Sequence, residues 1–377
     1  YKSFSDKPAL RVGGWINAII PILIVPYYSV IGGWVIKYLA EYLMGKAHLV
    51  AEDGYFSSFI SNGMSSELCF LVFTAMTLAI IFAGVENGIE RVSKIMMPIL
   101  VVLSLIIAVY SVTRPGALEG VKYFLVPNLD NFSWMTVVSA MGQMFYSLSI
   151  AMGILITFGS YMKKDTSIEE STQNVEIFDT AIAIMAGLMI IPAVYVFMGR
   201  DGMSAGPGLM FISLPKVFNE MGIAGDIVGL IFFMIVAFAA VTSSVSIMEA
   251  IVSSLIDRFH WSRRKSAILV TVYGLIAEII VCLGYNKLYM EVKLPNGTVG
   301  QILDIMDYVS NNVLMPIVAL ATCILVGWIV SPKVIIDEVT RGGSKFTRKG
   351  LYIIMVKFIA PAFLLILLLQ ALGIVTF

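Results

Sequence analysis

The sequence carries very little charge. Only 13% of its 377 residues are Asp, Glu, Lys or Arg, whereas soluble proteins have about a quarter. Its 25 basic and 25 acidic residues cancel, so no excess of positive charge indicates a nucleic-acid partner. Hydrophobic residues make up 59% of the chain and the mean hydropathy is +0.91. This composition excludes an ordinary soluble protein and indicates one whose surroundings are the lipid bilayer.

Residues that build metal centres and catalytic sites are also scarce. The three cysteines, Cys69, Cys282 and Cys323, lie in apolar runs without metal-ligand spacing or a disulfide pattern. Both histidines, His48 and His260, lie in polar segments. An enzyme would need a nucleophile with its base, or metal ligands, at membrane depth. We therefore do not expect an enzyme.

Long apolar runs are what the sequence does have. About nine of them recur, each long enough to cross roughly 30 Å of hydrocarbon. They do not alternate with period two, so they predict helices rather than the strands of a barrel. Their positions are near 15–43, 66–84, 92–112, 136–162, 174–199, 224–257, 265–284, 301–331 and 350–374. The sequence predicts one all-α transmembrane domain over 1–377, with short amphipathic pieces at 51–62 and 209–222.

The basic residues predict an orientation. If the first loop is placed in the cytoplasm and the loops alternate, the inner loops hold 16 Lys and Arg residues and the outer loops hold 7. That asymmetry follows the positive-inside rule. We expect a multi-pass protein of the cell membrane whose first residues are cytoplasmic. Because the chain opens with Tyr1 and not Met, we also expect it to be truncated at this end.

One predicted span is rich in small and polar residues. The 136–162 run contains GQMFYSLSIAMG, with Ser147, Ser149, Ala151 and Gly153 close together. Such a cluster predicts local unwinding near 145–153, and discontinuous helices are where many transporters bind ions and substrates. The alternative is an intact helix whose serines bond to their own backbone or to a neighbouring helix.

A second span presents hydroxyl groups on one face. In FAAVTSSVSIME, the residues Ala239, Thr242 and Ser243 are spaced i, i+3, i+4 and share that face. Neutral oxygen ligands suit a hard monovalent cation better than a transition metal. The alternative is a contact between helices that uses small residues.

Acidic residues within spans are rare and mark functional sites by default. Among them are Asp179, Glu249, Glu278, Asp304 and Asp307. The alternative for each is an ion pair with a basic residue of another helix. That alternative is strongest for Asp304 and Asp307, which lie near the expected interface.

These segments together resemble a known family. The stretches PYYSVIGGW, GQMFYSLSIAMG…SYMKKD, DTAIAIMAG…IP, TSSVSIME and LDIMDY occur in the order found in bacterial neurotransmitter:sodium symporters. The resemblance covers essentially the whole chain and implies the LeuT-type inverted-repeat fold. The nine runs correspond to that fold's third to eleventh helices, so its first two helices are expected to be missing.

The resemblance implies sodium-coupled symport of amino acids by alternating access, with a hydrophobic substrate as the expectation. Matched substrate-contact positions are Ile24, Tyr28, Tyr146, Ser149, Met152, Ser243 and Ile247. Ser147 and Asp179 match the first sodium site, and Ala239, Thr242 and Ser243 match the second. Tyr28, Tyr146 and Asp307 match the outer gate, and Ser160, Tyr161 and Asp257 match the inner gate.

Other expectations concern chloride and the competing functions. Asp179 stands where some relatives carry Asn, so a fixed negative charge beside sodium would make chloride unnecessary. An ion channel is disfavoured because no filter-like segment is present. A transporter-like amino-acid sensor, or a non-functional fragment without flux, remains the alternative.

Overall fold

The computed structural model describes residues 8–199, 206–341 and 345–375. Within these ranges, eight helical segments are long and apolar enough to cross a membrane, and each overlaps one predicted run. They are Gly13–Leu43, Gly63–Ala83, Val85–Val112, Ile168–Met198, Ile223–Phe259, Arg263–Leu283, Ile302–Ile329 and Lys349–Ala371. The remaining predicted run, 136–162, is divided into two shorter helices. The chain is thus a predominantly helical, multi-pass membrane protein.

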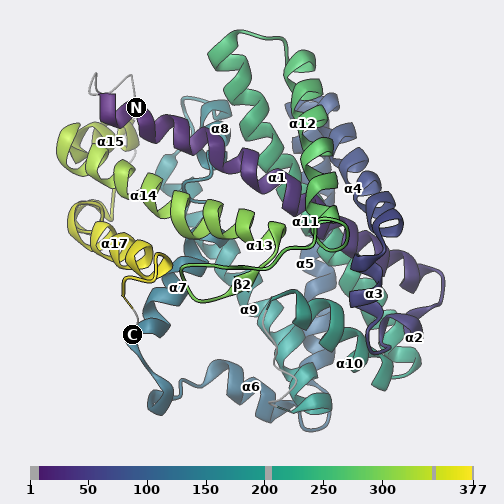
Figure 1. The fold of residues 1–377 in the computed structure, drawn as a ribbon. Coiled ribbons are helices and arrows are strands. Elements are labelled where there is room, and N and C mark those ends of the chain that lie inside the picture. Colours follow the sequence, from purple (N-terminus) through teal and green to yellow (C-terminus); the bar gives the residue numbers. More distant parts are fainter. Residues whose placement is uncertain (1–7, 200–205, 342–344, 376–377) are drawn as a thin grey trace.

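Figure 1 shows how the elements follow one another. The first part of the chain forms α1 (Pro8–Leu43), α2 (Ala47–Val50), α3 (Tyr55–Ser61), α4 (Gly63–Ala83), η1 (Val85–Glu90), α5 (Arg91–Val112), α6 (Ala117–Leu125) and η2 (Leu129–Asn131). The central part forms α7 (Trp134–Ser147), α8 (Ile154–Tyr161), α9 (Ile168–Met198), η4 (Leu209–Ser213), α10 (Leu214–Glu220), α11 (Ile223–Phe259) and α12 (Arg263–Leu283). The last part forms β1 (Val292–Lys293), β2 (Val299–Gly300), α13 (Ile302–Asp307), η5 (Tyr308–Leu314), α14 (Met315–Ile324), η6 (Leu325–Ile329), α15 (Pro332–Val339), α16 (Lys349–Ile354), η8 (Met355–Ile359) and α17 (Ala360–Ala371).

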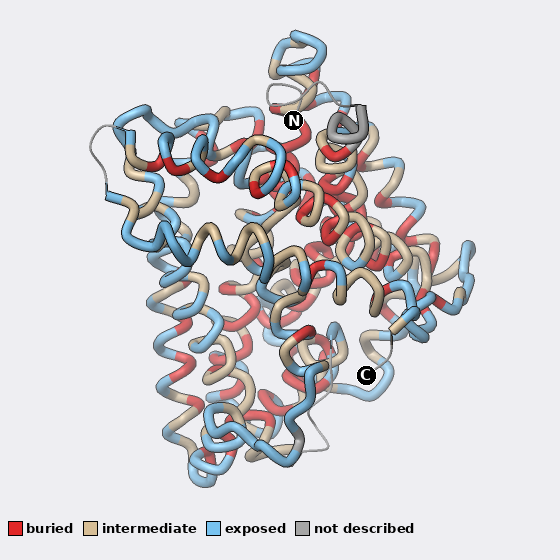
Figure 2. The backbone as a smooth tube through the Cα atoms, turned by 90° about the vertical axis from the view of Figure 1, so that its left-hand side faces the viewer, coloured by how far each residue is buried: buried red, intermediate tan, exposed pale blue. Residues whose placement is uncertain are grey.

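Helix α1 is the centre of the packing. In its most apolar stretch 67% of the residues are buried, against 6% for the span that contains α17. It contacts α4, α11, α12 and α14, and buried residues gather in the interior while exposed ones cover the outside (Figure 2). The helix that carries Tyr28 is therefore enclosed by protein, and the last span lies at the periphery.

Local sequence explains where several spans begin. The Asn62 side chain accepts a hydrogen bond from the Ser65 N–H at the start of α4, and Ser262 accepts one from the Lys265 N–H at the start of α12. These caps satisfy amide groups that a helix leaves free at its beginning. Gly84 separates α4 from η1 with a φ of +90°, a conformation that favours glycine.

The two predicted amphipathic pieces form short helices around one end of α1. They correspond to α3 and to η4 with α10. The Trp34 ring meets Phe56 of α3 and Phe211 of η4 edge-on, with ring centroids 5.2 and 5.8 Å apart. The Tyr38 hydroxyl donates to the Phe211 carbonyl at 2.7 Å. This aromatic packing holds both pieces against α1.

An ion pair also joins these pieces. Lys216 of α10 donates to the carboxylate of Asp53, which lies in the turn before α3. The ammonium group lowers the pKa of the Asp53 carboxyl below its usual range. Because Asp53 is fully exposed, water screens this ion pair. The pair therefore adds little to the stability of the fold and serves to orient α10 relative to α3.

Candidate functional site

The predicted unwinding is confirmed. Helix α7 ends at Ser147 and α8 begins at Ile154. Between them, Ser149 and Ala151 have φ values of +54° and +64°, and Gly153 has +78°. Two side-chain-bearing residues in the left-handed region mark a break that the surrounding protein must hold in place.

The break leaves backbone oxygens available. Among the described residues, no backbone N–H donates to the carbonyl oxygens of residues 147–152. The Ile150 N–H donates to the Phe145 carbonyl before the break, and the Thr157 N–H donates to the Gly153 carbonyl after it. Free carbonyls are tolerated at membrane depth only where they line a cavity or lie within protein. The break therefore leaves carbonyl oxygens without backbone partners beside the rest of the site.

A cavity of about 390 Å³ lies beside the break. It is lined by α1, η1, α5, the α7–α8 region and α11. Its lining residues are Ile24, Tyr28, Ile89, Ser93, Met97, Tyr146, Ser147, Ser149, Met152, Ile154, Phe158, Thr242, Ser243, Ser246 and Ile247. The structure thus brings all seven predicted substrate-contact residues to one cavity, although their roles remain predictions.

The cavity wall is polar on one part and apolar on another. Ile24, Met152 and Ile247 are 1%, 3% and 4% exposed and form an apolar wall. The Tyr28 hydroxyl faces the Ser243 side chain within the same cavity. A molecule with a charged end and an apolar side chain matches this division.

The two side chains of the predicted first sodium site are in contact. The Ser147 hydroxyl at the end of α7 donates to Asp179 Oδ1 at 2.5 Å, which joins the break to α9. This places a carboxylate next to the free carbonyls of the break. Such an arrangement can hold a hard cation by oxygen atoms alone.

The predicted second sodium site gathers oxygen atoms on α11. The Thr242 hydroxyl lies 3.1 Å from the Ala239 carbonyl oxygen and 3.0 Å from that of Phe238. Ser243 follows on the cavity wall. Among the described residues there is no group of three or more His, Cys, Asp and Glu side chains that could hold a metal. A cation here would be held by hydroxyl and carbonyl oxygens.

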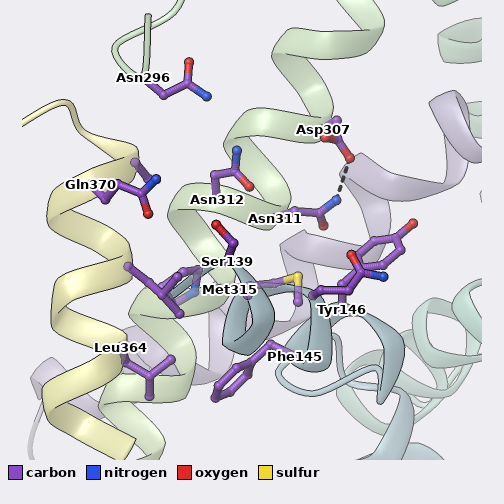
Figure 3. A pocket seen from close by; sticks show the side chains of 15 residues that line it. Ser139, Phe145, Tyr146, Asn296, Asp307, Asn311, Asn312, Met315, Leu364 and Gln370 are labelled. Carbon is purple, nitrogen blue, oxygen red and sulfur yellow. Dashed lines mark hydrogen bonds between the residues drawn. The ribbon is translucent and has the colours of Figure 1, made fainter. Parts of the chain in front are cut away.

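A second cavity of about 490 Å³ lies between α7, η5 and α17 (Figure 3). Tyr146 lines both cavities and so stands between them. Asp307, which the resemblance places in the outer gate, accepts from Asn311 Nδ2 at 2.6 Å, and this nitrogen lies 3.0 Å from the Tyr27 hydroxyl. The carboxamide of Asn311 thus links the Asp307 carboxylate to the phenol of Tyr27.

Asn311 was missed by the sequence reasoning. A signal for it exists, since Asn311 follows Asp307 by four residues and such pairs meet on one face of a helix. Its second partner, Tyr27, is 284 residues away in sequence. That contact between α1 and η5 depends on the fold.

The predicted inner-gate residues are not brought together. The Tyr161 hydroxyl donates to Glu249 Oε1 at 2.7 Å, and Ser160 donates to the Thr157 carbonyl of its own helix. Asp257 is exposed, and among the described residues no ion pair involves it. The contact that joins α8 to α11 here is therefore Tyr161 with Glu249.

Arg263 completes this contact. Its guanidinium group donates to both oxygens of the fully buried Glu249, at 2.7 and 2.6 Å, and to the Ile81 carbonyl at 3.2 Å. The group connects α4, α8, α11 and α12. For Glu249, the alternative of an ion pair with another helix is the one the structure shows.

Comparisons with known proteins identify the family. The chain is 33% identical to an uncharacterized sodium-dependent transporter, YhdH, of Bacillus subtilis, over all of this chain and 83% of that protein. An uncharacterized sodium-dependent transporter of Haemophilus influenzae is 31% identical over 95% of this chain and 78% of its own length. The solved structure of MhsT in complex with L-phenylalanine superposes with a TM-score of 0.84 and 34% identity, covering 97% of this chain and 82% of MhsT. Residues 55–376 match the family model, so the chain belongs to the sodium:neurotransmitter symporter family and has the LeuT-type fold.

Proposed function

We propose that this protein carries hydrophobic amino acids across a bacterial cell membrane together with sodium, by alternating access. The observation that carries the proposal is the cavity at the α7–α8 break, where free carbonyls and hydroxyls oppose an apolar wall. The bound L-phenylalanine of MhsT supports the substrate class. A zwitterion with an apolar side chain needs both halves of this lining.

The charged ends of the substrate need partners, because bare charges are costly to bury. Its carboxylate would meet the Tyr28 hydroxyl and a sodium ion held by Ser147 and Asp179. Its ammonium group would face the free carbonyls at the C-terminal end of α7, the negative end of the helix dipole. Ile24, Met152 and Ile247 would enclose its side chain. Ser149 at the break and Tyr146 in the last turn of α7 would contact it as well.

Sodium supplies the driving force. Each charge that moves down the membrane potential contributes about 2.3 kcal/mol per 100 mV, in addition to the concentration gradient. A second ion held by Ala239, Thr242 and Ser243 would add to this coupling. Because Asp179 provides a fixed negative charge, chloride is not required.

Gating would use the two ends of the cavity. Tyr28, Tyr146 and Asp307 would close the outer side, and Tyr146 stands between the two cavities as such a gate requires. Ser160, Tyr161 and Asp257 would act on the inner side. There the contact of Tyr161 with Glu249 offers a bond that must break when the inner side opens.

Uptake by the full-length native protein in proteoliposomes tests the proposal. We expect uptake of labelled hydrophobic amino acids that requires a sodium gradient. The double variant Thr242→Ala, Ser243→Ala should lose at least about tenfold in sodium affinity, whereas Ser254→Ala, whose hydroxyl bonds to its own helix at 2.7 Å, should not. Binding without flux would indicate a sensor, and uptake that ignores sodium would contradict the proposal.

A further inference from the structure

A carboxyl group lies fully buried in α12, outside the cavity. Glu278 is 0% exposed. The Thr74 hydroxyl of α4 donates to its Oε2 at 3.0 Å, and the Ser29 hydroxyl of α1 faces the same group. Its Oε1 has no hydrogen-bond partner among the described residues. The carboxyl therefore sits between three packed helices with hydroxyl groups around it.

No cation pairs with this carboxyl in the described part of the chain. Lys37 of α1 pairs with Glu41 at 2.5 Å, and Arg263 of α12 pairs with Glu249. Arg264 and Lys265 stand in the first turn of α12, more than three helical turns before Glu278. The titratable groups nearer to it carry no positive charge: Tyr28 on α1, Glu67 and Cys69 on α4, and Tyr273 and Cys282 on α12 itself. An unpaired carboxylate is far less favourable than the neutral acid in such surroundings. The packing fits a carboxyl group that holds its proton.

Hydroxyl groups link this carboxyl to the back of the cavity. Ser29 directly follows Tyr28, and Ser244 directly follows Ser243. Ser244 Oγ lies 3.3 Å from the Thr77 hydroxyl, and Thr77 stands three residues after Thr74 on α4. Ser29, Ser244, Thr74 and Thr77 are all at most 3% exposed. The two helices that line the cavity therefore touch the Glu278 surroundings through faces turned by about 100° from those that line it.

We propose that Glu278 is a proton-binding site whose occupancy is linked to sodium binding at the cavity, an inference that rests on the proposed function for its linkage. When the proton leaves, the O–H bond of the acid breaks, its electron pair stays on the carboxylate and the proton passes to water. Water reaches the group when the contacts between α1, α4 and α12 loosen.

The sign of the linkage follows from charge. A sodium ion on α11 adds a positive charge within the same poorly screened interior, and that charge favours the carboxylate over the neutral acid. Sodium binding therefore releases the proton. By reciprocity, a rise in pH strengthens sodium binding. A proton leaving as sodium enters is a counter-transport step.

The first test reads the proton directly and does not depend on transport. Infrared difference spectra of the purified full-length native protein between about pH 6 and about pH 9 should show the carbonyl band of a neutral carboxyl group that disappears on titration. The band should be missing in Glu278→Gln and present in the control Glu119→Gln, which alters an exposed acid on α6. A wild-type spectrum without that difference overturns the proton site.

The second test reads the linkage. Sodium-dependent binding of labelled L-phenylalanine should show an apparent sodium affinity that strengthens about fivefold over the same pH range in the wild type. In Glu278→Gln it should stay at the low-pH value, and Glu119→Gln should follow the wild type. A pH dependence that survives in Glu278→Gln overturns the linkage. If the infrared band titrates but no protein binds the amino acid with sodium, the proton site stands and the proposed function fails.

Discussion

Met152 bears most directly on which substrate fits. Its side chain is 3% exposed and completes the apolar wall of the cavity. Removing most of it in Met152→Ala should enlarge the space for the substrate side chain. We expect the ratio of kcat/KM for tryptophan to that for valine to rise about tenfold, the scale on which an apolar pocket discriminates by size. Competition uptake in proteoliposomes measures this ratio.

The matched control for this change is Met76→Ala. Met76 lies on the outer side of α4 and is 41% exposed. Its replacement should leave the ratio unchanged. If both variants shift selectivity equally, or neither does, Met152 does not define the substrate pocket.

Asp179 bears on the ion requirement. Its carboxylate accepts from Ser147 at the break, so a sodium ion there would have a fixed negative charge beside it. We expect wild-type uptake to be unchanged when gluconate replaces chloride. Asp179→Asn removes the charge without a large change in shape, and should lower uptake at least about tenfold. Asp165→Asn, an exposed residue before α9, should behave as the wild type; a chloride requirement in the wild type would refute the role of Asp179.

At the scale of elements, the α7–α8 break depends on a backbone conformation that side chains disfavour. Gly153 has a φ of +78°, and a Cβ there would lie 3.4 Å from Asn17 Nδ2. Gly153→Ala should therefore destabilise the protein by about 1–2 kcal/mol. Gly159, inside α8, has open space around its Cβ position, so Gly159→Ala should stabilise by about 0.5–1 kcal/mol.

Thermal unfolding in detergent distinguishes the two glycines. The melting temperature should fall for Gly153→Ala and rise or hold for Gly159→Ala, and only the first should impair amino-acid binding. Equal effects of both substitutions would mean that the left-handed conformation at Gly153 is not needed.

The contact of Glu249 with Arg263 and Tyr161 joins three helices, α8, α11 and α12. Glu249 is 0% exposed and the Arg263 side chain 29% exposed, so Glu249→Gln leaves a partly buried guanidinium group without its counter-charge. We expect a loss of stability of about 3 kcal/mol. The exposed pair of Glu338 with Arg341 offers the control, since Glu338→Gln should change stability by less than about 1 kcal/mol. Comparable losses of stability in both variants would show that burial does not make the Glu249 ion pair more important than an exposed one.

The sequence predicts the positions of the helices far better than it predicts which side chains from different helices are in contact. Hydropathy located the spans, because each run must match the membrane by itself, and the small polar residues of 145–153 indicated the break. The partner of Tyr161 is Glu249, 88 residues away, and only the packing of α8 on α11 selects it over Asp257. For Asn311, the spacing of four residues from Asp307 is a local signal, but its contact with Tyr27 spans 284 residues of sequence. Such choices are made by tertiary packing and not by local pattern.

At the scale of the whole molecule, the central helices work on two faces. Helices α1 and α11 present Tyr28 and Ser243 to the cavity, and the serine after each faces α4 and α12. The span that contains α17 is the least buried of the eight, and none of its described residues lines this cavity. A change of packing at α4 and α12 is therefore placed to reach the cavity through α1 and α11.

The orientation of the molecule yields a prediction that also tests the fold. Two spans and the broken α7–α8 segment lie between Glu52 and Lys164, so these exposed residues must be on opposite sides of the membrane. The positive-inside rule places Lys164 inside. In a variant without Cys69, Cys282 and Cys323, a membrane-impermeant maleimide should label Glu52→Cys on intact cells and Lys164→Cys only after permeabilisation. Labelling of Lys164→Cys alone on intact cells would invert the orientation. Labelling of both from outside would mean that the broken segment does not cross the membrane, so the cavity beside the break could not open to each side in turn.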